Sequence, residues 1–214
     1  QRQMCIRDRR TGTAMVKIAM DLLHEGEIDE KTALLRCEPN KLDELLHPVF
    51  DKEALAQSHV LTRGLPASPG AASGQVVFFA DDATKWHEDG HQVIMVRIET
   101  SPEDLAGMSA AEGILTARGG MTSHAAVVAR GMGKCCVSGA GAIMVDYKAR
   151  TLEIDGTIIR EGDYISLNGS TGEVYLGEVK TRPAEVTGDF AELMDLCKKY
   201  SKLVVRTNAD TPHD

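Results

Sequence analysis

The chain has 214 residues, 43% of them hydrophobic and 26% charged, which is typical of a globular protein with a buried core. Its formal net charge of -8 argues against binding to nucleic acid or to an anionic membrane, because either partner requires clustered Lys and Arg. No apolar run reaches the roughly 18–20 residues that a membrane-spanning helix needs, and no secretory signal opens the chain. We therefore expect an intracellular, cytoplasmic protein with no membrane partner.

The cysteines favour reduced thiols over a disulfide framework. Their number is odd and no C-x-x-C spacing occurs, so neither disulfides nor a zinc site is indicated. The pair Cys135 and Cys136 lies in the apolar run "CCVSG", where free cysteine commonly acts as a small hydrophobic side chain. We expect this pair to be structural rather than redox-active. The five cysteines are Cys5, Cys37, Cys135, Cys136 and Cys197.

A helical region is predicted first along the chain. Residues 1–9 have no hydrophobic period, and we interpret them as an artefact. A helix is predicted from Thr11 to the vicinity of Gly26. Its apolar face is formed by Met15, Ile18, Ala19, Leu22 and Leu23. The stretches "DEKTALLR" and "PNKLDELLHP" predict two shorter helices, the first capped by Asp29 and the second ending before Pro48.

A stretch rich in proline and glycine follows, "LTRGLPASPGAASG" at residues 61–74. Two prolines and three glycines within it cannot continue a helix, so it predicts a domain boundary and a hinge. Beyond it, the apolar runs "QVVFF", "QVIMVRI" and "GILTA" predict strands buried on both faces. "DDATKWHEDG" predicts a short helix or turn, and "SPEDLAGMSAA" begins with residues typical of a helix start.

After residue 134 the pattern becomes one of short strands separated by turns. The runs "CCV", "MVD", "TLEI", "TIIR", "YISL" and "EVYL" alternate with turn formers such as Asp155-Gly156 and Asn168-Gly169. We expect a compact α/β domain over residues 57–178, preceded by a helical lead-in over 1–56. Residues 179–214 predict a linker, the helix "DFAELMDLCKKY" and the strand "KLVVRTN". That last strand has no following element to pack against, so we expect an internal part of a longer protein.

The motif "GGMTSHAAVVARGMG" at residues 119–133 holds the candidate functional residues. It follows a predicted strand and opens a predicted helix, which places His124 in the first helical turn. The first N–H groups of a helix favour a bound anion, and glycines at 119 and 120 let the backbone approach it closely. Thr122 and Ser123 add hydroxyl donors beside the histidine. Neutral imidazole is a nucleophile that passes on a phosphoryl group easily, so the motif suits a phosphohistidine.

Other interpretations of these residues are weaker or carry no function. A histidine at a helix start without function is the commoner case in proteins at large. A Ser-His hydrolase is not favoured, because adjacent helical residues point apart. "GMGKC" is no phosphate-binding P-loop, since the first glycine would fall at Val128 and Cys135 replaces the hydroxyl residue. The remaining histidines lack metal-ligand spacing, and Gly90 interrupts the helix that His87 and His91 would need, so we predict no metal site.

The same residues resemble a known family. "ILTARGGMTSHAAVVARGMGKCCVSG" is similar to the phosphohistidine segment of the pyruvate, phosphate dikinases, which belong to the phosphoenolpyruvate (PEP)-utilising enzymes. The related PEP synthases and phosphotransferase-system enzymes I usually have Arg in place of Met121 and lack the "ARGMGKCCV" continuation. Further similar stretches are "LPASPGAASG", "ETSPED", "ISLNGSTGEVYLG" and "RTGTAMVKIAMDLL", so the resemblance extends from Arg10 to Asp214.

The resemblance implies a fold and a reaction. A swivelling β/β/α domain, here 57–178, would carry a histidine between an upstream ATP-grasp domain and a downstream PEP/pyruvate-binding α/β barrel that begins within 179–214. His124 would accept the β-phosphoryl group of ATP as tele-phosphohistidine, while phosphate takes the γ-phosphoryl group. Transfer from His124 to pyruvate would complete a reversible reaction that yields AMP, diphosphate and PEP. Thr122 matches the regulatory threonine that becomes phosphorylated in plant dikinases.

The resemblance also implies what lies outside this chain. Mg²⁺ and the nucleotide would be bound by other parts of the parent enzyme, so we expect no cofactor on these residues and no dikinase activity from them alone. The parent is expected to be a homodimer, cytoplasmic or organellar according to its N-terminal signal. Two alternatives stay open: the phosphocarrier segment of another PEP-utilising enzyme, such as a PEP synthase, and a non-catalytic interaction module that keeps the fold.

Overall fold

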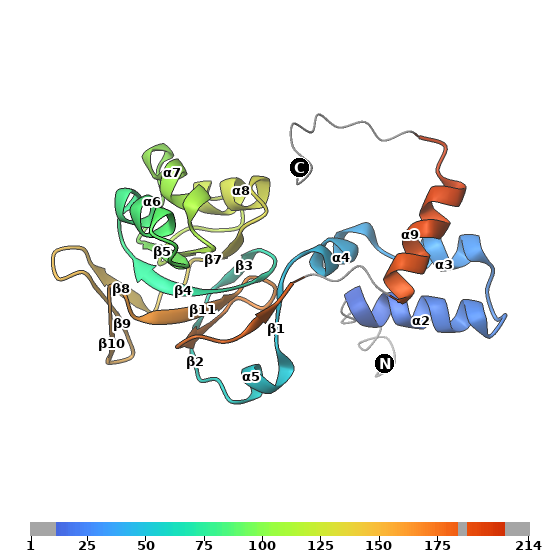
Figure 1. The fold of residues 1–214 in the computed structure, drawn as a ribbon, viewed down its shortest axis with the longest axis horizontal. Coiled ribbons are helices and arrows are strands. Elements are labelled where there is room, and N and C mark those ends of the chain that lie inside the picture. The colour runs from blue at the N-terminus through green and yellow to red at the C-terminus, as the bar shows by residue number, and fades with distance from the viewer. Residues whose placement is uncertain (1–11, 184–187, 204–214) are drawn as a thin grey trace. The chain divides into compact units, whose positions relative to one another are not determined.

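The computed structural model describes residues 12–183 and 188–203, which form two compact units (Figure 1). The larger unit comprises residues 46–183, and the smaller combines 12–45 with 188–203. The larger unit therefore extends beyond the predicted 57–178 at both ends. The reason is that β1 (Val49–Phe50) pairs antiparallel with β13 (Thr181–Arg182), which holds the first and last residues of this unit together.

A mixed eight-stranded sheet forms the centre of the larger unit. Its strand order is β2-β12-β11-β4-β5-β6-β7-β3, in which β4, β5, β6 and β7 are parallel and the outer pairs are antiparallel. The strands are β2 (Val60–Arg63), β3 (Leu65–Ser68), β4 (Ala71–Val77), β5 (Val93–Arg97), β6 (Gly113–Thr116), β7 (Cys135–Ser138), β11 (Tyr164–Asn168) and β12 (Glu173–Leu176). The predicted runs "QVIMVRI", "GILTA" and "CCV" are thus confirmed as buried strands.

Each face of this sheet is covered by a different layer, which gives a β/β/α architecture. Helices α6 (Ala80–Glu88), α7 (Leu105–Ala110) and α8 (His124–Gly131) lie together on one side (Figure 1). A three-stranded antiparallel sheet covers the other side, formed by β8 (Ile143–Asp146), β9 (Thr151–Ile154) and β10 (Thr157–Arg160). The predicted mixed α/β fold class is confirmed.

Alternating side chains of the central strands supply both cores. Met95 of β5 and Ile114 of β6 pack toward the helices, whereas their neighbours Ile94 and Leu115 pack toward the three-stranded sheet. All four are fully buried. Because successive side chains of a strand point to opposite faces, two covered faces require the continuous apolar runs that the sequence contains.

The predicted hinge at residues 61–74 is wrong. These residues form β2, β3 and the first half of β4 within the eight-stranded sheet. Pro66 is tolerated because β3 is an edge strand, where a missing N–H costs no ladder hydrogen bond. Gly74 is needed because a Cβ there would lie 2.8 Å from the carbonyl oxygen of Gln92. Glycine and proline thus mark close approaches and an edge of the sheet, not a linker.

Turn residues close the short strands as predicted. Asp155 and Gly156 both have positive φ, of 47° and 80°, and join β9 to β10 in a tight hairpin. A type I′ turn of this kind matches the twist of the flanking strands.

α5 (Lys52–Ala56) begins after Asp51, whose carboxylate accepts hydrogen bonds from the N–H groups of Glu53 and Ala54.

The smaller unit is helical. It contains α2 (Gly12–His24), α3 (Glu30–Arg36), α4 (Pro39–Asp43) and α9 (Asp189–Tyr200), and the 3₁₀ helix η1 (Glu44–Leu46) follows α4. The predicted cap is confirmed, since Asp29 accepts a hydrogen bond of 2.9 Å from the N–H of Thr32. The predicted strand "KLVVRTN" lies mostly outside the described residues, as do residues 1–9, Cys5 and His213. None of the helices in the described ranges is long and apolar enough to cross a membrane.

The buried face of α2 matches the predicted one only in part, since Met15 and Ala19 are buried as predicted. Val16 and Met20 are buried, whereas Ile18 and Leu22 are only half-buried. Helix α2 packs against both α3 and α9, and Phe190 and Leu193 of α9 complete its apolar cluster. Contact with a helix from the other end of the chain rotates the buried face away from the position that periodicity alone predicts.

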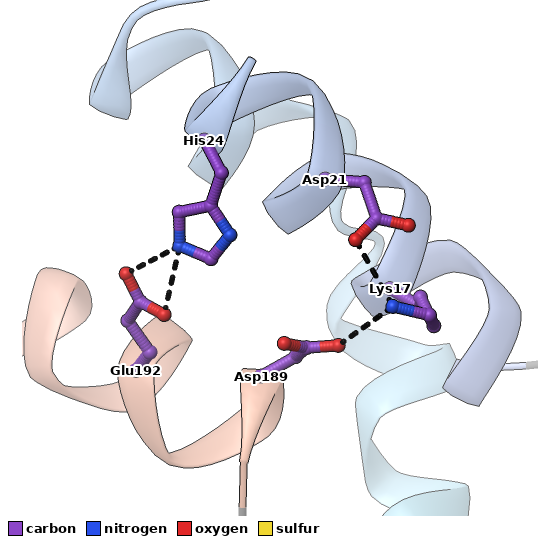
Figure 2. A network of polar contacts seen from close by, with 5 residues as sticks. All are labelled: Lys17, Asp21, His24, Asp189 and Glu192. Atoms are coloured by element: carbon purple, nitrogen blue, oxygen red, sulfur yellow. Dashed lines mark hydrogen bonds and ion pairs between the residues drawn. The ribbon is translucent and has the colours of Figure 1, made fainter. Parts of the chain in front are cut away.

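Polar contacts also join α2 to α9 (Figure 2). His24 Nε2 lies 3.0 Å from one carboxylate oxygen of Glu192 and 3.1 Å from the other. Lys17 Nζ contacts Asp21 at 3.0 Å and Asp189 at 3.7 Å. The hydrogen bond and charge of Glu192 raise the pKa of His24, with smaller contributions from Asp189 and Asp21.

Replacement of Glu192 with Gln should lower the pKa of His24, as measured by an NMR pH titration of its ring. Because the protonated ring is the better partner for Glu192, this contact is fully formed below the ordinary histidine pKa and is lost as pH rises through the raised value. Asp195→Asn on the same helix is the matched control and should leave the titration unchanged, since Asp195 pairs with Lys198. An unaltered His24 pKa in Glu192→Gln would contradict the contact.

Replacement of Gly169 with Ala should destabilise the larger unit, because a Cβ there would lie 1.9 Å from the carbonyl oxygen of Ser68. Overpacking of this kind costs about 1–3 kcal/mol of unfolding free energy. Gly141→Ala is the matched control, with nothing within 4 Å of the added methyl. Urea unfolding followed by the fluorescence of Trp86, the single tryptophan, measures both variants. Equal stability of the two would show that the backbone accommodates the methyl.

Candidate functional site

The candidate site lies at the carboxyl ends of two parallel strands. The loop 98–104 follows β5, and the loop 117–123 follows its neighbour β6. The N–H of Ala117 donates to the carbonyl of Arg97 at 3.0 Å, and the N–H of Arg118 donates to that of Ile98 at 2.9 Å. Parallel pairing thus continues into the loops and holds them side by side where α8 begins.

The start of α8 has the form expected from the motif. His124 is the first helical residue, and Ser123 is the N-cap, with its hydroxyl 3.4 Å from the N–H of Ala126. Within the described part of the chain, the N–H groups of His124 and Ala125 find no acceptor. These donors and the helix dipole make the site favourable for an anion.

Gly119 and Gly120, the two glycines before the helix, have different structural roles. Gly119 has a φ of 109°, and a Cβ there would lie 3.0 Å from the side chain of Ser123. Its carbonyl oxygen would in turn be only 2.5 Å from a Cβ at Gly139, so two loops pack closely here. At Gly120 an added Cβ meets nothing within 4 Å. Gly119 is therefore required by the fold, whereas the absence of a side chain at Gly120 leaves open space beside the helix start.

A hydrogen bond from Thr100 orients the imidazole of His124. Thr100 Oγ1 lies 3.0 Å from His124 Nδ1, and the ring is half-buried. In the tautomer with its proton on Nδ1, the ring donates to Thr100 and the lone pair of Nε2 is available. Nε2 has no hydrogen-bond partner among the residues described. Thr100 is a site residue that is not predicted from the sequence, because the stretch "ETSPED" indicates only a helix start and a resemblance to the family.

Buried polar contacts fix the loop that carries Thr100. The carboxylate of Asp104 is buried, accepts a hydrogen bond of 2.8 Å from the N–H of Ser101 and pairs with Arg97 at 3.3 Å. On the other side of Thr100, the N–H of Ile98 donates to the hydroxyl of Tyr147 at 2.8 Å. The Thr100 hydroxyl therefore sits on a loop anchored at both ends, as precise positioning of a reactive side chain requires.

Arg130 of α8 holds the loop before the helix. Its Nε donates to the carbonyl of Ala67 at 2.8 Å, and its guanidinium also donates to the carbonyl of Met121. The next residue, Thr122, is exposed, and its hydroxyl has no hydrogen-bond partner in the described structure. The five predicted residues 119, 120, 122, 123 and 124 thus share one loop and helix start, with Thr122 facing solvent.

Cys135 and Cys136, which follow α8 in the chain, contribute no reactive thiol to this site. Cys135 and Cys136 are buried in opposite cores, and burial raises the pKa of the Cys136 thiol to about 11 and that of Cys135 further. A thiol with so high a pKa is almost entirely protonated near neutral pH and is a poor nucleophile. The structural interpretation of this pair agrees with their environment.

No alternative site emerges at the other histidines that the structure describes. His87 lies on α6, whereas His91 follows Gly90, whose φ is 88°, and contacts the ring of Trp86. Within residues 12–183 and 188–203, no group of three or more His, Cys, Asp or Glu side chains could hold a metal ion.

Comparisons with known proteins identify the same region. Residues 90–172 match the family "PEP-utilising enzyme, mobile domain". The chain is 57% identical over 206 residues to a pyruvate, phosphate dikinase of Clostridium symbiosum, covering 96% of this chain and 24% of that protein. It is 55% identical to a chloroplastic pyruvate, phosphate dikinase of Flaveria pringlei, covering 98% of this chain and 22% of the relative.

Two further similarities define the extent of the match. The chain is 53% identical to pyruvate, phosphate dikinase 2 of Zea mays, covering 98% of this chain and 24% of that relative. It thus spans about a quarter of the length of these relatives. A solution structure of an Enzyme I protein aligns with a TM-score of 0.29 and 23% identity over 51% of this chain and 37% of that one, too low to support an argument.

Replacement of Thr100 with Val should shift neutral His124 away from the tautomer protonated on Nδ1, because the acceptor for that proton is lost. Thr100→Ser keeps the hydroxyl and should keep the tautomer ratio. Two-bond ¹H–¹⁵N NMR correlations of the His124 ring at alkaline pH distinguish the two forms. If Thr100→Val and the unaltered chain gave the same ratio, Thr100 would not select the tautomer.

Proposed function

Because residues 90–172 match the PEP-utilising enzyme mobile domain family, we propose that His124 carries a phosphoryl group within a pyruvate, phosphate dikinase. The observation that carries the proposal is the hydrogen bond between Thr100 and His124 Nδ1, which leaves Nε2 as the nucleophile at a helix N-terminus. The identities of 53–57% to dikinases over nearly the whole chain support this choice of enzyme.

The chemistry at His124 is nucleophilic displacement at phosphorus. The Nε2 lone pair forms the N–P bond as the P–O bond to the leaving group breaks. The ring then carries a positive charge that is shared with Nδ1, and the Nδ1–H group donates a hydrogen bond to the hydroxyl oxygen of Thr100. On the nucleotide side, the bond to the β-phosphorus that breaks releases the oxygen of AMP, and the γ-phosphoryl group passes to phosphate. On the PEP side, the leaving oxygen is that of the pyruvate enolate. The reverse displacement returns the phosphoryl group.

The start of α8 stabilises the phosphoryl group once it is attached. The N–H groups of His124 and Ala125 are without acceptors in the described structure, Gly120 puts no side chain beside them, and Thr122 and Ser123 add hydroxyls in the two positions before the histidine. An anion at a helix N-terminus gains about 0.3–1 kcal/mol when exposed, and up to about 2 kcal/mol when partly buried. This modest stabilisation suits a carrier that must release its group as readily as it accepts it.

The remaining machinery lies on other parts of the parent chain in this proposal. An ATP-grasp domain binds ATP and phosphate, a PEP/pyruvate-binding barrel binds pyruvate, and Mg²⁺ assists phosphoryl transfer by neutralising charge when it is bound there. The 214 residues alone therefore do not convert ATP to AMP. We place the parent, as a homodimer, in the cytoplasm or in an organelle; the Flaveria pringlei relative is named chloroplastic.

Residues 46–183 are the moving carrier in this proposal. The first and last residues of this unit lie close together because β1 pairs with β13. An ion pair between Arg182 and Asp51 lies beside these strands. A carrier tethered on short linkers has an effective concentration near the millimolar range at each site that it reaches. Residues 12–45 would complete the region after the ATP-grasp domain, and 188–203 would open the barrel.

Thr122 is a site of control in the same proposal. Its hydroxyl is exposed two residues before His124, so a kinase reaches it without unfolding the loop. A phosphate there adds about -1.5 to -2 charge at pH 7 and repels the incoming phosphoryl group. Phosphorylation of Thr122 would therefore switch off transfer without altering the fold.

The chain should become phosphorylated on His124 when mixed with PEP, Mg²⁺ and the separately produced PEP-binding half of the Clostridium symbiosum relative. Mass spectrometry should locate one acid-labile phosphoryl group on His124, and His124→Gln should take up none. The intact relative serves as a positive control. A folded, unphosphorylated chain beside a phosphorylated control would favour an interaction module that lacks the chemistry.

A further inference from the structure

The loops that meet at His124 carry more negative than positive charge at their surface. Glu99 and Glu103 are exposed on the loop after β5, while the carboxylate of Asp104 is buried against Arg97. A phosphoryl group on His124 would bring further negative charge to this edge of the sheet. A nearby cation is needed to compensate for it, because the helix N-terminus supplies only about half a positive charge.

Arg118 is the cationic residue of these loops whose guanidinium is free to bind a new anionic partner. Arg97 is tied to Asp104, and Arg130 is occupied by the carbonyls of Ala67 and Met121. The side chain of Arg118 is 74% exposed, and its one ion pair in the described structure, with Glu99, is 4.0 Å long. An exposed pair of this length contributes little stability, so its partner is easily exchanged.

The backbone places Arg118 at the site. Its N–H is bonded to Ile98 and its carbonyl accepts a hydrogen bond of 2.7 Å from the hydroxyl of Thr116, so the residue is anchored at both peptide groups. It directly precedes Gly119, whose Cα packs against Ser123, and its ion-pair partner Glu99 directly precedes Thr100. Arg118 and its partner Glu99 are thus the chain neighbours of Gly119 and Thr100, on the two loops that meet at His124.

We propose that Arg118 leaves Glu99 and binds the phosphoryl oxygens when His124 Nε2 is phosphorylated. A planar guanidinium donates two parallel hydrogen bonds to phosphate oxygens, which a carboxylate partner at 4.0 Å does not receive. Glu99 holds the guanidinium near the site while the histidine is free and competes for it afterwards. This inference rests on the proposed phosphoryl-carrier function and adds a binding residue and a competing carboxylate to it.

A small phosphoryl donor tests the proposal on this chain without any catalytic partner. Potassium phosphoramidate transfers its phosphoryl group to histidine, with the new N–P bond forming as ammonia leaves. The rate of phosphorylation of His124 is followed by intact mass, with the site mapped by fragmentation. Arg118→Gln should slow this rate by about 10- to 100-fold, below the loss for a fully buried oxyanion donor. Arg118→Lys should restore part of it, since the charge but not the paired geometry is kept.

Two further variants separate a role in binding from a role in folding. Glu99→Gln should raise the rate or leave it unchanged, because it frees Arg118, whereas a merely structural ion pair would make Glu99→Gln as slow as Arg118→Gln. Arg160→Gln, on the exposed outer edge of the three-stranded sheet, removes the same charge elsewhere and should behave like the unaltered chain. Circular dichroism and Trp86 fluorescence check that each variant is folded.

A ³¹P NMR titration of the phosphorylated chain gives a second readout. Arg118 should hold the pKa of the phosphoryl group on His124 below the value found in Arg118→Gln, since the guanidinium favours the more charged form. Equal rates and equal pKa values in the unaltered chain and Arg118→Gln would overturn the proposal, as would equal losses in Arg118→Gln and Glu99→Gln. An unaltered, folded chain with no phosphoryl group on His124 would overturn the carrier function itself, and this inference with it.

Discussion

Parallel pairing of β5 with β6 is the constraint on which the rest of the site depends. Both strands end at the same edge of the sheet, so the loops after them run side by side and their backbones stay hydrogen-bonded. One loop supplies Thr100 and the other leads into α8, which brings a hydroxyl to Nδ1 of His124 across 24 residues of sequence. An antiparallel pair would have placed these loops at opposite ends. The orientation of the imidazole, on which the proposed chemistry at Nε2 rests, therefore follows from strand direction.

The same sheet makes residues 46–183, the proposed carrier, a compact body. Helices cover one face and a three-stranded sheet covers the other, so the parallel strands are buried on both sides and His124 lies on a helix packed against them. Buried alanines at 125, 126 and 129 let α8 approach β7 and β3 closely. A histidine on such a helix would keep its orientation while the whole unit moves, as the proposed carrier function requires.

Element positions follow from the sequence to a large extent, and the failures have identifiable causes. Buried strands, the Asp155-Gly156 hairpin and the helix at residues 189–200 agree with local pattern, because apolar period, caps and turn residues act over a few positions. The stretch 61–74 is not a hinge, because its glycines allow close contact with neighbouring backbone, as Gly74 does with the carbonyl of Gln92. The buried face of α2 differs because α9, about 170 residues later, packs on it.

Within the site, local sequence is enough to predict the features that are adjacent in the chain: His124 at a helix start, Ser123 as its cap, and a glycine of positive φ at 119. Such features depend on local backbone geometry, which a short motif specifies. Three relations depend on the folded chain: Thr100 meets the imidazole, Glu99 faces Arg118, and Gly120 borders open space. Those relations join loops separated in sequence, and they exist only once strand order and direction have brought the loops together.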